Sequence, residues 1–267
     1  TNGLKLGIDF KGGTLIEIQT QEVVKEDVIK AYVNKFSEDQ DLLKGSVNTS
    51  GEKSYQIKLD YIDEITHQKF KNELSQEINQ EITETRFENV GASVSKTLAN
   101  KALISLTIAL LAIILYIAIS FREIPQEYNP FKFGLAAIVA LVHDVVITLG
   151  IFSLFGIEID ILFITALLTI LGFSVHDTIV VFDRIRENLL KIKKSETLED
   201  VSNAALNETL TRSINTSIST LITLLSLFIL GAASIKYFIL ALIIGILVGT
   251  YSSIFIAAPT MIKINKK

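Results

Sequence analysis

The chain has 267 residues, of which 49% are hydrophobic and 20% are charged. This content is too apolar for an ordinary soluble protein of that length, so we expect a membrane protein. The formal net charge is −4 and no basic patch is interleaved with aromatic residues, so the sequence gives no case for nucleic-acid binding. The chain contains no cysteine, which excludes disulfides, thiolate catalysis and cysteine-ligated metal.

Residues 1–97 are predicted to form a small α+β domain with a linker. They carry more than half of the acidic residues and nearly half of the basic ones. The local patterns follow the order β-β-α-β-β-α, which suggests a ferredoxin-like sandwich with helices on one sheet. The strands are expected at 6–10, 14–19, 46–48 and 55–59, and the helices at 22–36 and 62–82. Gly12-Gly13 lacks the pattern of a phosphate-binding loop and predicts a turn or hinge.

Residues 98–267 are predicted to form an α-helical transmembrane bundle. They contain five apolar runs, and each is close to or above the roughly 20 residues that a spanning helix needs. The runs cover residues 98–120, 133–155, 159–181, 214–230 and 237–262.

The charges between the runs predict the orientation of the bundle. Nearly all Lys and Arg of the connections lie at one set of helix ends, whereas the opposite short loops carry only Lys236, with Glu158 and Asp160. The positive-inside rule places the basic ends and the C-terminus in the cytoplasm, and residues 1–97 outside it. A domain of that size does not cross a membrane unaided. We therefore expect a hydrophobic helix to precede Thr1.

The third apolar run contains a carboxylate, Asp177, towards its predicted cytoplasmic end. An ionisable group at this depth is costly and by default marks an ion or proton pathway. Arg212 opens the next helix and supplies a positive charge that could partner it. Arginine keeps its proton, so it could hold Asp177 ionised but could not relay a proton itself. The alternative interpretation is a structural ion pair that ties the two helices together.

Two further polar groups are secondary candidates for the pathway. The fourth run carries a stripe of hydroxyl side chains at helical spacing, formed by Thr216, Ser219, Thr220 and Thr223. This stripe could line a wetted path, although such hydroxyl groups equally serve hydrogen bonds between membrane helices. The pair His143-Asp144 falls near the middle of its span, where a charge is most costly, and Asp144 could instead be neutral and hydrogen-bonded.

Small residues four apart in the last run predict close helix packing. A stripe of this kind lets another helix approach closely, and it carries no chemistry. The stripe consists of Ala241, Gly245, Gly249 and Ser253.

Four stretches of this sequence resemble the SecF branch of the SecD/SecF family of protein-export membrane proteins, which belongs to the resistance-nodulation-division superfamily. The stretches are 7–14, 140–150, 176–188 and 210–217, of which 176–188 is specific on its own. The resemblance implies six spans with the exterior domain between the first and second, so the helix expected before Thr1 would be the first. It also implies that Asp177 and Arg212 are the proton-responsive pair.

The resemblance implies a function in export across the bacterial cytoplasmic membrane. Such a protein would use the proton-motive force, together with SecD, to promote the export of preproteins that SecA drives through SecYEG. We expect no metal, no cofactor and no enzyme activity. Two other interpretations stay open: a proton-coupled exporter of lipids or small molecules on the same architecture, and an intramembrane hydrolase that uses Asp144, Asp177 and the histidines.

Overall fold

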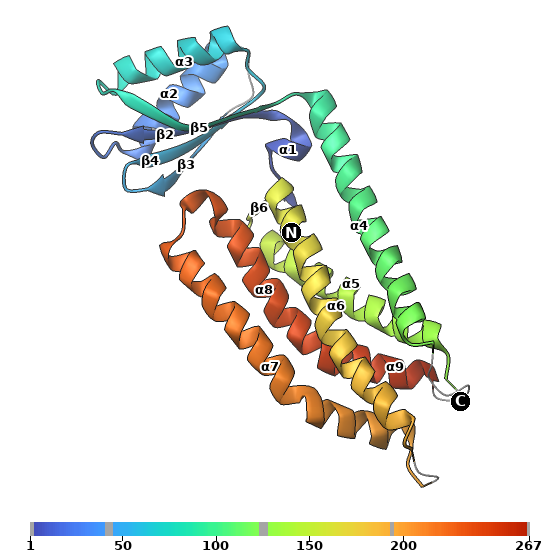
Figure 1. Ribbon diagram of the computed structural model, residues 1–267. Coiled ribbons are helices and arrows are strands. Elements are labelled where there is room, and N and C mark those ends of the chain that lie inside the picture. The colour runs from blue at the N-terminus through green and yellow to red at the C-terminus, as the bar shows by residue number, and fades with distance from the viewer. Residues whose placement is uncertain (1–2, 41–44, 123–127, 193–194, 266–267) are drawn as a thin grey trace. The chain divides into compact units, whose positions relative to one another are not determined.

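The computed structural model describes residues 3–40, 45–122, 128–192 and 195–265. The chain divides into two compact units (Figure 1). One unit comprises residues 6–101 and is called the N-terminal unit here. The other comprises residues 102–267 with the first five residues, and is called the helical unit.

The N-terminal unit is an α+β sandwich. Its sheet has the strand order β3-β4-β2-β5, and every neighbouring pair is antiparallel. The elements from β2 onward follow the order βαββαβ, which is that of ferredoxin-like folds and agrees with the predicted fold class. Their bounds are β2 (Gly13–Thr20), α2 (Glu26–Asp39), β3 (Ser46–Gly51), β4 (Ser54–Leu59), α3 (Glu64–Glu77) and β5 (Ile82–Val90).

The core of this unit lies between the sheet and the two helices α2 and α3. Alternate residues of β4 are buried, as expected of a strand with one face on a core. Ile57 and Ile16 of the sheet belong to the same buried cluster as Phe36 of α2 and Phe70 of α3. The rings of Phe36 and Phe70 meet edge to face with their centroids 5.0 Å apart, a favoured geometry for aromatic pairs.

One predicted element of this unit was wrong, and one strand was missed. The expected strand at 6–10 is instead the short strand β1 (Lys5–Leu6) followed by one helical turn, α1 (Ile8–Lys11). The strand β5 was not predicted. It lies at the edge of the sheet and carries Thr, Glu and Arg where an inner strand would carry apolar residues, so its sequence lacks the usual alternation.

The double glycine joins α1 to β2 through two unusual backbone conformations. Gly12 has φ 83° and Gly13 has φ 129°, values that side chains with a Cβ rarely adopt. A Cβ on Gly13 would lie 2.8 Å from the carbonyl oxygen of Leu59, and one on Gly12 would lie 3.3 Å from that of Val90. The turn therefore fits against the ends of β4 and β5.

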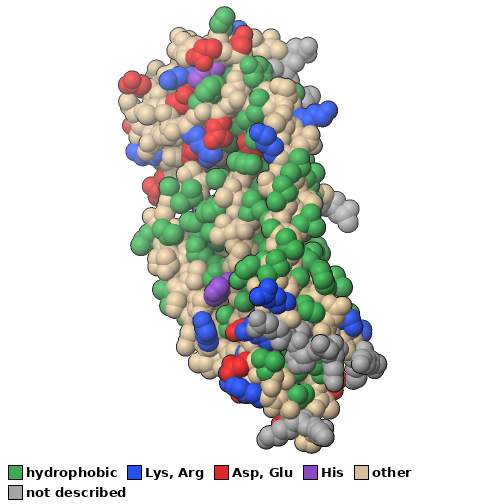
Figure 2. Space-filling model, turned by 45° about the vertical axis from the view of Figure 1, so that its right-hand side comes forward, with side chains coloured by type: hydrophobic (Ala, Val, Ile, Leu, Met, Phe, Trp, Pro, Cys, Tyr) green, Lys and Arg blue, Asp and Glu red, His purple; other side chains and the backbone are tan. Residues whose placement is uncertain are grey.

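Within its described residues, the helical unit contains the predicted bundle, with five helices long and apolar enough to cross a membrane. In the described residues the last of these is formed by α8 and α9 together, joined by a π-helical turn. The element bounds are α4 (Ala92–Ser120), α5 (Pro130–Leu154), β6 (Glu158–Ile159), α6 (Ile161–Leu189), α7 (Leu198–Leu230), η1 (Ala233–Ile235), α8 (Lys236–Ser252), η2 (Ser253–Ala257) and α9 (Ala258–Asn265). Figure 2 shows a band of hydrophobic side chains with few charges on the visible surface of these helices.

Side-chain caps fix where three of these helices begin. Asn129 accepts a hydrogen bond from the backbone N–H of Phe131, next to a proline at the first helical position. Asp160 caps α6 in the same way, and Thr197 forms a reciprocal capping box with Asp200 at α7.

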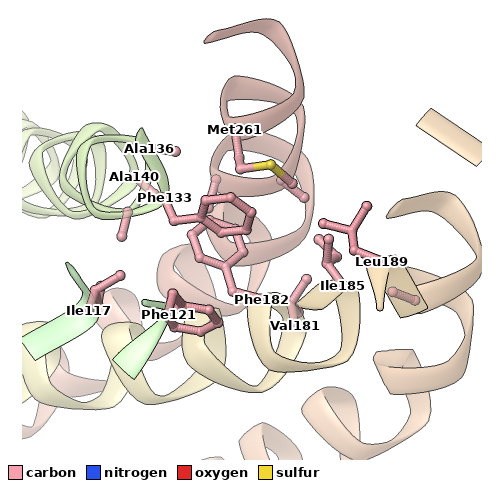
Figure 3. Packing of buried hydrophobic residues seen from close by; sticks show 14 of the residues in the cluster. Ile117, Phe121, Phe133, Ala136, Ala140, Val181, Phe182, Ile185, Leu189 and Met261 are labelled. Carbon is pink, nitrogen blue, oxygen red and sulfur yellow. The ribbon is translucent and has the colours of Figure 1, made fainter. Parts of the chain in front are cut away.

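A cluster of buried apolar side chains packs α4, α5, α6 and α9 together. The ring of Phe133 contacts those of Phe121 and Phe182, with centroids 5.7 and 5.4 Å away. Figure 3 shows the rings of Phe133 and Phe182 next to Met261, which is fully buried. The cluster holds α6 against its neighbours at the end of the helix that follows Asp177.

The small residues of α8 lie against α6. Gly245 is buried beside Ile170, and Gly249 is buried beside Ser174. A Cβ on Gly245 would lie 2.2 Å from Cδ1 of Ile170, a distance that no packed structure tolerates without movement. The glycines thus allow the α6 and α8 backbones to approach closely.

We expect Gly245→Ala to lower the free energy of unfolding by about 1–3 kcal/mol, because the added methyl group overpacks the α6–α8 contact. Thermal denaturation in detergent, followed by circular dichroism, measures this change. Gly172→Ala is the matched control, since a Cβ there would meet no atom within 4 Å. Equal melting temperatures for the two variants would contradict the packing role, and Ile170→Ala should partly restore stability to Gly245→Ala.

Candidate functional site

Two buried carboxylates on neighbouring helices form the centre of the candidate site. Asp144 of α5 has no exposed surface, and Asp177 of α6 is 5% exposed. An ionised carboxylate in an apolar interior is costly unless hydrogen bonds or opposite charges compensate it. Their hydrogen-bond partners therefore decide what each can do.

Asp144 receives hydrogen bonds from three other side chains. Its Oδ2 accepts from Oγ of Ser174 at 2.6 Å and from Oγ of Ser252 at 2.8 Å. Its Oδ1 lies 3.1 Å from Nδ1 of His143, the preceding residue. Because the two serines belong to α6 and α8, this carboxylate connects three helices.

Asp177 has a single hydrogen-bond partner among the side chains that the structure describes. Its Oδ2 accepts from Oγ of Ser253 at 2.9 Å. Ser174, which donates to Asp144, lies three residues earlier on the same helix and therefore on the same face. One turn of α6 thus carries both Asp177 and a hydrogen-bond donor to Asp144.

The adjacent residues Ser252 and Ser253 point to different carboxylates at the place where α8 changes its winding. Ser252 ends α8, and Ser253 begins the π-helical turn η2. Neighbouring residues of an α-helix point about 100° apart, so two consecutive hydroxyl groups reach two different helices here. Turns of π-helix within α-helices are frequent at functional sites.

A further hydroxyl pair extends the polar contact to α7. Oγ of Ser217 lies 2.5 Å from Oγ1 of Thr250, on the turn of α8 that precedes Ser253. Ser213, one turn earlier on α7, is also buried, and its hydroxyl has no partner among the described atoms. A line of small hydroxyl side chains thus follows the α7–α8 contact.

The predicted pair of Asp177 and Arg212 forms no ion pair in the described part of the chain. Arg212 is exposed on α7, and its backbone oxygen accepts a hydrogen bond from Thr216 at 2.9 Å. The structure brings Asp177 to a serine instead. The functional pairing of these two residues stays a prediction.

The predicted stripe on α7 lies largely on the outer surface of the helical unit. Thr216, Ser219 and Thr223 are exposed and Thr220 is half-buried. Each hydroxyl donates to the backbone oxygen four residues earlier in its own helix. The stripe therefore does not join α7 to the other described helices, and any path along it would run outside them.

The two histidines of the helical unit occupy different environments. His143 is half-buried, with its ring centroid 6.4 Å from that of Tyr251 on α8, whereas His176 is exposed. Within the described residues no group of three His, Asp or Glu side chains could hold a metal ion.

Ser174 and Ser252 were missed by sequence reasoning as partners of Asp144, and Ser253 was predicted only to pack. The available signal was Ser252-Ser253 within an otherwise apolar run, since polar side chains in a membrane helix usually meet other polar groups. Nothing in the sequence indicates which carboxylate each serine reaches.

These features define a class of protein: a multi-pass membrane protein with ionisable side chains in the interior of its helix bundle. Residues 70–267 match the family "Protein export membrane protein SecD/SecF, C-terminal", and residues 1–22 match the SecD/SecF GG motif. The chain therefore belongs to the SecD/SecF family, and it functions in Sec protein translocation.

Relatives named protein translocase subunit SecF are similar over nearly the whole chain. The one from Thermobaculum terrenum is 43% identical, and the match covers 99% of this chain and 86% of the relative. The one from Anaerolinea thermophila is 38% identical over 97% of this chain and 84% of the relative.

Two solved structures of SecDF share the fold. The structure of SecDF from Thermus thermophilus, described as a translocon-associated membrane protein, is 30% identical with a TM-score of 0.84. SecDF in a super-membrane-facing form is 29% identical with a TM-score of 0.65. In both cases the match covers 98% of this chain and 35% of the SecDF chain, so this chain spans about a third of SecDF.

We expect Asp144→Ala to lower the free energy of unfolding by about 2–4 kcal/mol, because it leaves buried donors without their acceptor and opens a small cavity. Asp144→Asn keeps the shape and an acceptor oxygen, so it should cost less. Asp183→Ala is the exposed control on α6 and should change stability by less than about 1 kcal/mol. Equal losses for Asp144→Ala and Asp183→Ala, measured by thermal denaturation, would contradict the importance of this hydrogen-bonded cluster.

Proposed function

We propose that this chain works with SecD in the bacterial cytoplasmic membrane, where the proton-motive force acts through Asp177 to promote preprotein export. The N-terminal region, residues 1–97, would lie outside the cytoplasm and the C-terminus inside it, as the distribution of basic residues indicates. The chain would act on polypeptides that SecA drives through SecYEG, and it would have no enzyme activity of its own.

One observation carries this proposal. Asp177 is 5% exposed, and its only described hydrogen-bond partner is the neutral hydroxyl of Ser253. Among the described side chains no positive charge pairs with Asp177, so the gain or loss of a proton would change its hydrogen bonding to Ser253 and with it the arrangement that the helices prefer. Intramembrane carboxylates of this kind are used in proton-driven pumps and transporters.

Arg212 would bind Asp177 in a second arrangement of the bundle. Arginine stays charged at all accessible pH values, so it would pair with ionised Asp177 and separate from it after protonation. The two SecDF structures support a protein with more than one arrangement, because their TM-scores to this chain differ although their sequence identities are nearly equal.

The proton-motive force supplies enough free energy for such a change. One elementary charge that crosses about 150 mV releases about 3.5 kcal/mol. This shifts the ratio of two conformations by a few hundredfold, which is enough to make the less populated one predominate when the starting ratio is about ten to one.

The competing interpretations have less support. The SecF-named relatives cover nearly the full chain and favour protein export over an exporter of lipids or small molecules. A hydrolase would need two catalytic groups that converge on a substrate. Here both carboxylates are enclosed by helices and occupied by serine hydroxyls. Metal-dependent cleavage by the purified protein would revive that interpretation.

Asp177→Asn should abolish the part of export that depends on the proton-motive force, because asparagine cannot gain or lose the proton. The measurement is export of a labelled preprotein in membrane vesicles, with and without an uncoupler, for complexes that contain SecD. Asp183→Asn is the matched control, since it makes the same change two turns further along α6 at an exposed position. Undiminished export by Asp177→Asn would refute the role of this residue.

The α7 stripe can be tested with single cysteines, because the chain contains no other thiol. If the stripe lines a wetted path, cysteines at 216, 219 and 223 should react with a water-soluble maleimide in intact membranes. Ile222→Cys is the control, because that residue is 60% exposed but apolar, and it should face lipid and stay unlabelled. Absence of labelling at 216, 219 and 223 would contradict a wetted path along the stripe.

A further inference from the structure

The serine pair at the end of α8 links the two carboxylates in a way that the proposed function does not use. We propose that Asp144 is a second protonation site, and that Ser252 and Ser253 couple its state to that of Asp177 through the π-helical turn. This inference rests on the proposed function, in which Asp177 changes its protonation state.

Each of the two serines has two acceptors within reach but one hydrogen to donate. Oγ of Ser252 lies 2.8 Å from Oδ2 of Asp144 and 3.2 Å from the backbone oxygen of Gly249. Oγ of Ser253 lies 2.9 Å from Oδ2 of Asp177 and 3.0 Å from the backbone oxygen of Thr250. Each hydroxyl can therefore serve a carboxylate or its own helix.

The protonation state of a carboxylate decides between these acceptors. An ionised carboxylate accepts hydrogen bonds only, and charge-assisted bonds are about twice as strong as neutral ones, so it attracts the serine hydrogen. A protonated carboxyl group is itself a donor and competes less well for that hydrogen. Protonation of Asp144 or Asp177 would thus return the hydrogen of its serine to the backbone of α8.

When either serine hydroxyl donates to the backbone instead of to a carboxylate, the new hydrogen bond forms within one turn of the same helix. The backbone acceptors, at Gly249 and Thr250, are consecutive residues of the last turn of α8, directly before η2. Hydroxyl groups that donate to a preceding carbonyl can bend a helix. A change at either carboxylate would therefore alter the turn that positions the other serine, which is the requirement for coupling between two sites.

Few other charges face these two carboxylates. Asp144 contacts His143 on its own helix, and the next titratable ring, Tyr251 of α8, lies beside His143. On the face of α6 that carries Asp177, the next charged side chain is Arg184, two turns further along, and it pairs with Glu187 and Glu208. His176 and Arg212 are exposed. Apart from His143, none of these groups is a described hydrogen-bond partner of either carboxylate, so the serines are the shared contacts.

Infrared difference spectroscopy tests whether Asp144 binds a proton. The full complex with SecD is compared at two pH values, and the C=O stretching bands of protonated carboxyl groups are assigned with Asp144→Asn and Asp177→Asn. We expect each variant to remove one band. A spectrum that Asp144→Asn leaves unchanged would overturn the assignment of Asp144 as a protonation site.

The coupling is tested by the pH dependence of uncoupler-sensitive export. Asp144→Asn should displace the pH midpoint by about one unit, equivalent to a tenfold change in apparent proton affinity. In the backgrounds Ser252→Ala and Ser253→Ala the same substitution should no longer displace it. Ser252→Thr keeps the hydroxyl and should retain the displacement. Ser226→Ala is the control, because that hydroxyl lies on exposed α7 and bonds its own backbone.

The outcomes separate this inference from the proposed function. If Asp177→Asn abolishes driven export but Asp144→Asn leaves the midpoint unchanged, the inference is wrong and the proposed function stands. If Asp177→Asn has no effect, the proposed function fails. If Asp144→Asn displaces the midpoint equally in all backgrounds, the serine coupling is overturned. Should Ser252→Ala fail to assemble with SecD, the isosteric Ser252→Cys replaces it in the same comparison.

Discussion

The structure depends on how two negative side chains are accommodated inside an apolar helix bundle. Asp144 is held by three donors from three helices or turns, whereas Asp177 has one serine. The hydrogen bonds of Asp144 join α5, α6 and α8, whereas the described hydrogen bond of Asp177 joins α6 to the π-helical turn η2.

The bundle provides this arrangement through close packing of α6 and α8. Gly245 and Gly249 have no side chain to separate the helices, so the turn with Ser252 and Ser253 comes within hydrogen-bond distance of both carboxylates. The aromatic cluster around Phe182 fixes the following part of α6. Packing and electrostatics are therefore coupled here, since a methyl group on Gly249 of α8 would press on Ser174 of α6 and disturb its hydrogen bond to Asp144.

Much of the fold could be predicted from the sequence because the physical signal was strong. Five long apolar runs are close to or above the length that spans a bilayer, and Asp144 and Asp177 stand out within them. The partners of the carboxylates could not be predicted, because helix rotation and packing decide which face meets which neighbour. The exposed position of Arg212 could not be predicted either, because it also depends on how α7 is rotated against its neighbours. Strand β5 escaped detection because an edge strand can be polar on both sides.

The double glycine of the N-terminal unit has a consequence for how loss-of-function changes are interpreted. Its two residues combine left-handed backbone angles with main-chain oxygens of β4 and β5 in direct contact, so even alanine would strain the loop and push on both strand ends. The SecD/SecF GG motif covers this position. A defect caused by substitution there is a defect of domain architecture, and it would not by itself identify a surface that touches the exported polypeptide.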